Sequence, residues 1–413
     1  MRTIETCRVC GGQFETVWNL GELYVSDFPL PTEGDGTKAP LELVLCKSCS
    51  LLQLKHTVSA ETMYRNYWYR SGINQTMCTA LADIANKAEE LIHLEHGDVV
   101  LDIGCNDGTL LQSYNTKAYK IGFDPAKNMK QYSEQVAFVV DDFFTIENYS
   151  KVPDVPKPKI VTAIAMFYDL DDPNKFVADV KTVMDQDGVF IIQMSYLPDM
   201  LRTNEFSNIC HEHVEFYSLL SLVNLLKLHE MRIVDVELND INGGSIRAYI
   251  RNIYADPKQF GDQTYRTLAL NRVAELLNAE KKMRLDELDP YNSFRSYVER
   301  IRYDIVGFIT DEVTENHSTG IYGASTKGNT LLQYFQLDNN IIDFAADRNP
   351  DKWGRVTVGS RIPIISEDEM RKSGIKNLLV LPWHFVSEFK VREKEWLKSG
   401  GRFILPAPHF TLI

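Results

Sequence analysis

The chain has 413 residues, of which 44% are hydrophobic, 11% aromatic and 24% charged. At roughly 150 residues per domain this length predicts two to three domains, and the composition excludes a disordered, collagen-like or coiled-coil protein as a whole. Its 44 basic and 57 acidic residues give a net charge of -13 with no block of Lys and Arg, which argues against nucleic acid as a partner.

The start of the chain lacks the apolar run of a signal peptide, and no apolar stretch approaches the roughly 18 residues of a membrane-spanning helix. We therefore expect a cytoplasmic protein with no membrane partner, as a monomer or weak dimer.

Two Cys-x-x-Cys motifs follow, and together they contribute Cys7, Cys10, Cys46 and Cys49. In a reducing compartment four paired thiolates favour a metal over disulfides, and we predict a structural Zn2+ with no open position for catalysis. The Gly- and Pro-containing segment between the motifs looks too irregular for a core of its own, so the metal would supply folding free energy. Four packed, reduced cysteines or a redox pair are the alternatives.

A strand, a tight turn and a helix start are predicted over residues 98–111, where an apolar run ends in the sequence DIGCNDG. Further apolar runs end in acidic residues near 124 and 141, and others cover 159–166 and 188–194, with a helical stretch between them. Strands that alternate with helices predict a parallel, doubly wound sheet that binds its ligand at the carboxyl ends of the strands.

The turn itself discriminates between NAD and S-adenosylmethionine. Asn106 stands where a dinucleotide fingerprint has its middle glycine, and Asp102 and Asp107 bring negative charge. This charge repels a pyrophosphate but attracts a sulfonium, and Asp124 can accept hydrogen bonds from both ribose hydroxyls. We predict S-adenosylmethionine as the cofactor; a turn that serves packing alone is the alternative. The predicted cofactor-binding residues are Asp102, Gly104, Asn106, Gly108, Asp124, Asp141, Asp142 and Met166.

Residues 257–316 predict one long helix that bridges to a last domain, because their apolar residues recur at helical spacing. A second strand, turn and helix start follows at 320–329, with strands at 340–347 and 377–383. This turn carries Lys327 and hydroxyl groups, which suit a phosphate or diphosphate; a purely structural module is the alternative.

The predicted fold class is therefore α/β, in three parts. These are an N-terminal zinc-binding module (1–60), a central Rossmann-like S-adenosylmethionine-dependent methyltransferase domain (61–256) and a C-terminal Rossmann-like α/β domain with bridging helices (257–413).

Several motifs together resemble the sugar C-methyltransferases of deoxysugar biosynthesis, which methylate C3 of dTDP-linked 4-keto-6-deoxy sugars. They are the cysteine motifs, the segment 67–71 (YWYRS), the 102–108 turn, Glu212-His213, the segment 243–245 (GGS) and the segment 322–327 (YGASTK). The resemblance covers nearly the whole chain. It implies a C-methyltransferase that acts on a nucleotide-linked keto sugar at the carbon next to the ketone.

Methyl transfer to carbon needs a carbanion, which an imidazole can generate beside a ketone if a donor stabilises the enolate oxygen. His213 matches the family's base. Glu212 matches the family's glutamate and would orient the base or bind a sugar hydroxyl. Tyr69 or Tyr67 would meet the oxyanion, and we favour Tyr69. His211 has no third partner at a spacing that would suit a catalytic metal.

Two positions depart from the family. Cys210 stands in place of a tyrosine and Asp169 in place of a histidine, so the sugar, its stereochemistry and the methylated carbon stay open. Arg247 could pair with a phosphate or with a local carboxylate. The predicted substrate-binding residues are Asp169, Cys210, Asn242, Ser245, Arg247, Tyr322, Ser325, Lys327 and Asn329. Alternative functions are an O-methyltransferase, a methyltransferase of a non-sugar acceptor, and a noncatalytic zinc-bearing binding module.

Overall fold

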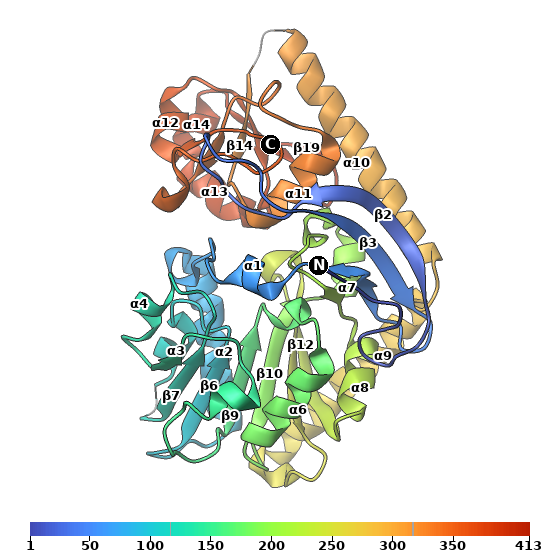
Figure 1. The fold of residues 1–413 in the computed structure, drawn as a ribbon, viewed down its shortest axis with the longest axis vertical. Coiled ribbons are helices and arrows are strands. Elements are labelled where there is room, and N and C mark those ends of the chain that lie inside the picture. The colour runs from blue at the N-terminus through green and yellow to red at the C-terminus, as the bar shows by residue number, and fades with distance from the viewer. Residues whose placement is uncertain (116, 316–317) are drawn as a thin grey trace.

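A seven-stranded sheet forms the centre of the computed structural model, which describes residues 1–115, 117–315 and 318–413 (Figure 1). Its strand order is β12-β13-β10-β9-β6-β7-β8. Strands β6 to β10 lie next to one another in the order β10-β9-β6-β7-β8, and all five run parallel. Their bounds are β6 Val99–Ile103, β7 Tyr119–Phe123, β8 Phe138–Val140, β9 Ile160–Ile164 and β10 Val189–Ser195.

The predicted sheet is wrong at one edge, where β12 (Met231–Asn239) and β13 (Ser245–Asn252) are antiparallel to their neighbours. The two strands are joined by a short turn instead of a crossover helix, and a turn of that length can connect only antiparallel strands. In this turn Asn242, Gly243 and Gly244 all have positive φ. The Gly-Gly pair in the sequence is thus a hairpin signal.

Helices cover both faces of the sheet because neighbouring strand residues point to opposite sides. Val100 packs with residues of α2, whereas Val99 and Leu101 pack with residues of α6 and α8. The helices before β13 are α1 Ala60–Tyr64, α2 Gln75–Leu91, α3 Thr109–Ser113, α4 Lys130–Ser133, α5 Ile146–Tyr149, α6 Pro173–Val183, α7 Leu197–Arg202 and α8 Leu219–Lys227.

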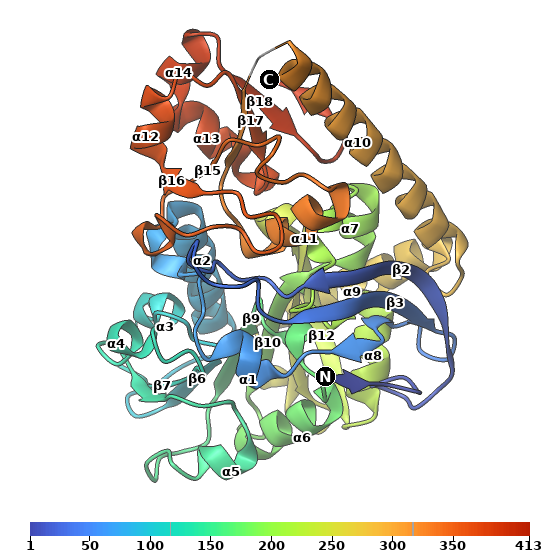
Figure 2. The ribbon, with the colours of Figure 1, turned by 45° about the horizontal axis from the view of Figure 1, so that its top comes forward.

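The N-terminal segment forms a long ribbon of β2 (Phe14–Tyr24) and β3 (Lys38–Cys46), which runs beside α10 (Figures 1 and 2). The segment was expected to lack a core of its own; Trp18 and Leu43 are buried in a cluster that they share with Phe294 of α10. β4 (Leu52–Leu54) extends the ribbon, and β11 (Glu215–Phe216) adds a strand from the middle of the chain. β1 (Arg2–Thr3) pairs with β5 (His56–Thr57).

The predicted single bridging helix is two helices, α9 (Gln263–Met283) and α10 (Asp289–Thr314). Arg284 follows α9 with φ 54°, a left-handed conformation that ends a helix. Val273 and Leu277 of α9 pack on the methyltransferase core, so the change to the last domain falls between α9 and α10. Residue 316, the last residue of the predicted helix, lies outside the described residues.

The C-terminal domain holds a six-stranded sheet of order β16-β15-β14-β17-β18-β19. Its strands are β14 Thr319–Tyr322, β15 Ala345–Asp347, β16 Ile364–Ser366, β17 Asn377–Val380, β18 Arg402–Leu405 and β19 Thr411–Leu412. Its helices are α11 Thr326–Phe335, α12 Glu367–Lys372, α13 Val386–Arg392 and α14 Lys394–Lys398. Across the described part of the chain, no helix is both long and apolar enough to span a membrane.

Candidate active site

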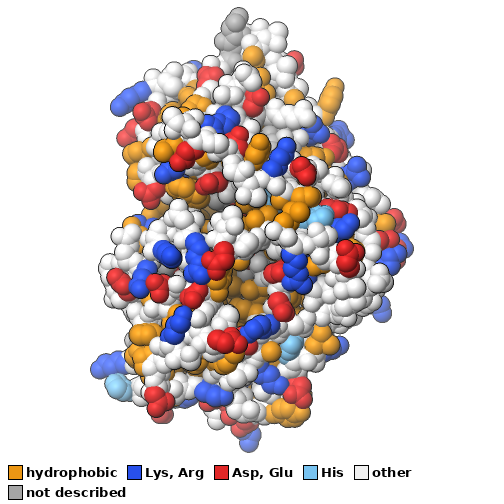
Figure 3. All heavy atoms as spheres, in the orientation of Figure 1, with side chains coloured by type: hydrophobic (Ala, Val, Ile, Leu, Met, Phe, Trp, Pro, Cys, Tyr) orange, Lys and Arg blue, Asp and Glu red, His pale blue; other side chains and the backbone are white. Residues whose placement is uncertain are grey.

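A cavity of about 420 Å³ lies at the carboxyl ends of the parallel strands, where an α/β sheet binds its ligand. It reaches from the turn after β6 to the start of α11, so the middle and the C-terminal domains both line it. Figure 3 shows a hollow with hydrophobic side chains near the middle of this face, edged by charged side chains. The cavity can therefore hold an apolar or aromatic group and polar groups at once.

The turn after β6 brings bare backbone to the cavity. Gly104 has φ 77°, and a Cβ there would lie 2.9 Å from Cγ of Met166, so only glycine fits. Asn106 also has positive φ and lines the cavity. Gly108 has φ 81° and packs against Val136 and Ser133 without lining the cavity, which makes its role one of turn geometry.

Two buried acids stand at the strand ends. Asp124 accepts hydrogen bonds from the backbone N–H of Asn106 and of Ala126, both at 2.8 Å. A carboxylate oxygen accepts more than one hydrogen bond, so Asp124 can still bind ribose hydroxyls. Asp102 accepts a hydrogen bond from Thr162 Oγ1 at 2.6 Å, and burial raises the pKa of Asp102 to about 7.

The end of β8 supplies Asp142 and the ring of Phe143. A carboxylate beside an aromatic ring suits a purine with an amino group. Asp142 pairs with Arg65 Nη2 at 3.0 Å, while Asp141 pairs with Lys130 at 3.1 Å and does not line the cavity. With the open glycine turn and the acid after β7, these residues fit S-adenosylmethionine.

The loop that carries Glu212 and His213 is held from two sides. Leu54 N donates to Val214 O at 2.8 Å, and Val214 N donates to Tyr168 O at 2.9 Å. The loop thus lies between the N-terminal sheet and the turn Phe167–Asp169 after β9. His211 is hydrogen bonded to Ala39 O at 3.0 Å, away from the cavity, and is structural.

A cluster of acidic and basic side chains lines the far end of the cavity. This acid and base cluster contains Asp169, Glu212, His213 and Lys327. The ring of His213 lies 4.2 Å from that of Tyr168, centroid to centroid. Burial, assisted by the positive charge of Lys327, keeps the pKa of His213 well below 6.5, so its imidazole is neutral at pH 7. Burial raises the pKa of Asp169 and of Glu212. The charge of Glu212 raises the pKa of Asp169 further, whereas the charge of Lys327 partly opposes the rise in both pKa values.

Lys327 reaches this cluster from the first turn of α11, in the C-terminal domain. Its Nζ donates to Asn208 Oδ1 at 2.7 Å. We predicted that this lysine binds a phosphate; in the structure the charge of its ammonium acts to lower the pKa of both Glu212 and His213. Lys327 therefore lies close to the acid and base cluster.

Tyr67 and Tyr69 both line the cavity. Burial raises the pKa of each, so both are protonated donors. The charges of Asp169 and Glu212 also raise the pKa of Tyr67, whereas Asp107 in the cofactor turn raises that of Tyr69, so the choice between them stays a prediction. Tyr64, which sequence reasoning missed, donates to Glu212 O at 3.0 Å.

The remaining predicted substrate residues divide in two. Asn242 and Cys210 line the cavity, whereas Ser245, Arg247, Tyr322, Ser325 and Asn329 do not. Arg247 pairs with Asp83 at 2.9 Å, so of its two predicted partners, a phosphate and a local carboxylate, the structure shows the carboxylate. Tyr322 donates to Glu367 and to Glu393 in the core of the C-terminal domain.

The other three have local partners. Ser325 accepts from Gly328 N as the N-cap of α11, Ser245 donates to Ile241 O, and Asn329 donates to Asp27 O. Sequence reasoning also missed Tyr168 and Asn208; the adjacency of Tyr168 to Asp169 was the one available signal.

The four N-terminal cysteines converge as predicted. Their sulfur atoms all lie within 4.8 Å of one another, with Cys7 and Cys49 3.6 Å apart and Cys10 and Cys46 3.5 Å apart. Sulfurs about 2.3 Å from a tetrahedral ion are about 3.8 Å apart, so the set fits Zn2+. The hydrogen bond between Cys7 and Cys49 lowers the pKa of Cys7 and raises that of Cys49, so the metal-free cluster shares its protons unequally and a bound metal would displace them.

A Rossmann-like domain with an acidic ligand turn, joined to a four-cysteine metal site, defines a methyltransferase with a zinc-binding module. Three family models match the chain: "Putative zinc binding domain" over residues 7–64, "Methyltransferase domain" over 69–236 and "C-methyltransferase C-terminal domain" over 240–408. C-methyltransferase NovU of Streptomyces niveus is 30% identical over 420 residues, covering 100% of this chain and 98% of that protein. The chain therefore belongs to the S-adenosylmethionine-dependent C-methyltransferases, and the predicted cofactors are confirmed.

Solved structures are similar over the central domain. A methyltransferase from Clostridium acetobutylicum is 14% identical with a TM-score of 0.32, and covers 42% of this chain and 91% of its own. A methyltransferase from Aquifex aeolicus is 18% identical with a TM-score of 0.29, and covers 42% and 97%. At these scores they carry no argument about function.

Proposed function

We propose that the enzyme methylates the carbon next to the ketone of a nucleotide-linked 4-keto-6-deoxy sugar, at C3, with His213 as the general base. The family membership supports C-methylation, and the chemistry of the cavity supports a ketone substrate. The observation that carries the proposal is a buried, neutral imidazole that shares one cavity with the cofactor turn.

Deprotonation is the first task of the chain. The neutral His213 imidazole removes the proton on the carbon next to the ketone, and the electron pair moves to the ketone oxygen as an enolate. Because His213 is only 5% exposed, water competes poorly for this position. General base catalysis of this kind contributes roughly 100- to 10,000-fold.

The enolate oxygen needs a donor. Lys327 lies in the acid and base cluster and Tyr67 lines the same cavity, and either can donate a hydrogen bond to a developing negative charge. S-adenosylmethionine, held at the turn after β6, would supply an electrophilic methyl group to the enolate carbon and would leave as S-adenosylhomocysteine. His213 holds the proton that it has taken and then releases it to solvent.

The proposal is tested with His213→Asn and a screen of dTDP-, GDP- and CDP-linked 4-keto-6-deoxy sugars in D2O. We expect the variant to bind S-adenosylmethionine with unchanged affinity but to lose exchange of the proton next to the ketone, which NMR detects in the wild type. Retained exchange would exclude His213 as the base.

The product spectrum tests the reaction class and the position. A new methyl carbon bonded to C3 supports the proposal, and one at C5, the other carbon next to the ketone, would move the reaction site. A methyl group on oxygen would refute C-methylation of this substrate.

A further inference from the structure

Two buried carboxyl oxygens in the cavity have no partner in the described part of the chain. They are Oδ1 of Asp169 and Oε2 of Glu212. Both residues line the cavity, and Glu212 is only 7% exposed. A buried polar atom left unsatisfied costs roughly 1–3 kcal/mol, so two of them in one cavity point to a ligand with hydroxyl groups.

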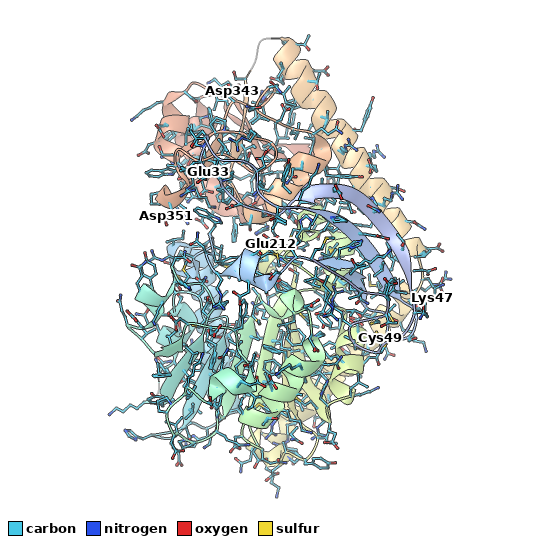
Figure 4. All side chains as sticks on the ribbon, in the orientation of Figure 1. Glu33, Lys47, Cys49, Glu212, Asp343 and Asp351 are labelled. Atoms are coloured by element: carbon cyan, nitrogen blue, oxygen red, sulfur yellow. The ribbon has the colours of Figure 1, made fainter. Side chains whose placement is uncertain are left out.

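The two acids come from different loops that meet at one place. Asp169 ends the turn after β9, and Glu212 lies in the loop between α7 and β11. Figure 4 shows Glu212 where the methyltransferase domain, the β2–β3 ribbon and the C-terminal domain come together. Asp169 and Glu212 line the same cavity, and the charge of Glu212 adds to burial in raising the pKa of Asp169, so the two carboxyls can face neighbouring groups of one ligand.

The local charge favours a neutral ligand that donates hydrogen bonds. The charge of Lys327 partly opposes the burial that raises the pKa of both acids, and its Nζ already donates a hydrogen bond to Asn208. Tyr64 donates to the backbone oxygen of Glu212, and hydrogen bonds from Cys210 and Ser26 act to lower the pKa of the Glu212 carboxyl, but none of these groups is a partner of Glu212 Oε2 in the described part of the chain. A hydroxyl donates to such an oxygen and adds no charge.

We propose that Asp169 and Glu212 form a binding site for two neighbouring sugar hydroxyls, so that the substrate is a sugar that keeps its C2 and C3 hydroxyl groups and not a 2-deoxy sugar. This inference rests on the proposed function, because only a 4-keto sugar bound at His213 presents these hydroxyls to the two acids. Asp169 is the acid to vary in a test of specificity, because Glu212 is adjacent to the proposed base His213 in the chain and its replacement would also disturb the base.

A 2-deoxy substrate leaves one buried carboxyl oxygen unpaired and brings no compensating contact. Sites that are built to bind a hydroxyl reject the analogue that lacks it by large factors. We expect the wild type to prefer the 2-hydroxy sugar by about 100-fold in kcat/KM.

The experiment compares a nucleotide-linked 4-keto-6-deoxyglucose with its 2-deoxy counterpart, on the nucleotide that supports turnover. The enzymes are the wild type, Asp169→Leu, Asp169→Asn and the control Asp311→Leu, which replaces an exposed acid on α10. Circular dichroism confirms folding. Calorimetry with S-adenosylhomocysteine present measures binding of each sugar apart from turnover.

We expect Asp169→Leu to lower the preference to less than about 10-fold in both kcat/KM and affinity. Asp169→Asn keeps an amide oxygen and should retain most of it, and Asp311→Leu should not change it. A wild-type preference within about 3-fold, or an unchanged preference in Asp169→Leu, overturns the site but leaves the proposed function standing. Carbon methylation of neither sugar overturns the proposed function, and this inference with it.

Discussion

Arg8 connects the cysteine motifs to the catalytic loop, and replacing it with methionine tests this connection. The Arg8 side chain is fully buried, between two of the metal ligands in sequence. Its guanidinium donates to Gln53 Oε1 at 3.3 Å, to Leu54 O at 2.5 Å and to Thr57 Oγ1, and it pairs with Asp171 at 3.5 Å. Asp171 lines the cavity, and Leu54 N bonds to the loop of His213.

The cost follows from what Arg8→Met leaves behind. Methionine fills most of the volume, but no donor remains for Leu54 O, and buried Glu215 loses a nearby positive charge. A buried acceptor that loses its donor costs roughly 1–3 kcal/mol, and Arg8→Met removes the donor of several acceptors, so we expect a loss of about 3 kcal/mol in total. At roughly 2–4 °C per kcal/mol for a large domain, the melting temperature should fall by roughly 10 °C.

Arg2→Met is the matched control, because Arg2 also pairs with Asp171, at 2.6 Å, but is 58% exposed. An exposed ion pair contributes about 0–1 kcal/mol, so this variant should melt within about 2 °C of the wild type. Both zinc-loaded proteins are compared by scanning calorimetry, and methyl transfer is measured well below melting. Equal melting temperatures for the two variants would refute the connection.

Three further predictions follow from the site. Removal of zinc by a chelator should lower the melting temperature. Metal-free protein that is still folded should keep its activity, because four sulfur ligands leave no position on the metal for substrate. Loss of activity without unfolding would contradict this. His213 is active when neutral, and its lowered pKa keeps it neutral from pH 8 down to 6.5, so its protonation should reduce kcat/KM only below pH 6.5. The unfolded chain binds this proton more readily, so the stability contribution of His213 should also be lost as the pH falls below 6.5, which denaturant titrations at pH 5 and 7 would detect. Gly104→Ala places a Cβ 2.9 Å from Met166 Cγ at a positive φ, and should raise the KM for S-adenosylmethionine at least 10-fold with little change in thermal stability; an unchanged KM would remove this turn from the cofactor site.

Local features were predictable from the sequence. The strand, turn and helix around Gly104, the acid at Asp124 and the two cysteine motifs each depend on residues close together in the chain, and the structure places them as expected. Arg284 is the counterexample, because an arginine does not signal a left-handed residue, although Pro290 in the first turn of α10 was available as a signal that the predicted helix divides.

Contacts between distant segments were not predictable. The β2–β3 ribbon looked irregular because its apolar face is completed by Phe294, which is remote in sequence. Tyr322 and Ser325 share a motif with Lys327, but a strand residue and an N-cap are used by their own domain, and of these three residues Lys327 alone lines the cavity. A motif therefore identified the correct turn without revealing which of its side chains meets the substrate.

The position of Lys327 makes the reaction depend on how the two α/β domains are held together. Its helix, α11, is anchored to the N-terminal segment as well, since Gln333 bonds to the backbone of Tyr24 in both directions and Ser26 donates to Thr326 O. A cation in a cluster of buried acids is most effective when its position is fixed in advance, because no reorganisation then accompanies the developing enolate charge. The ribbon that begins at the cysteine motifs and ends beside α11 thus supports both sides of the cavity. A structural metal can in this way support both sides of the cavity by stabilising the fold of the N-terminal segment, without taking part in the chemistry.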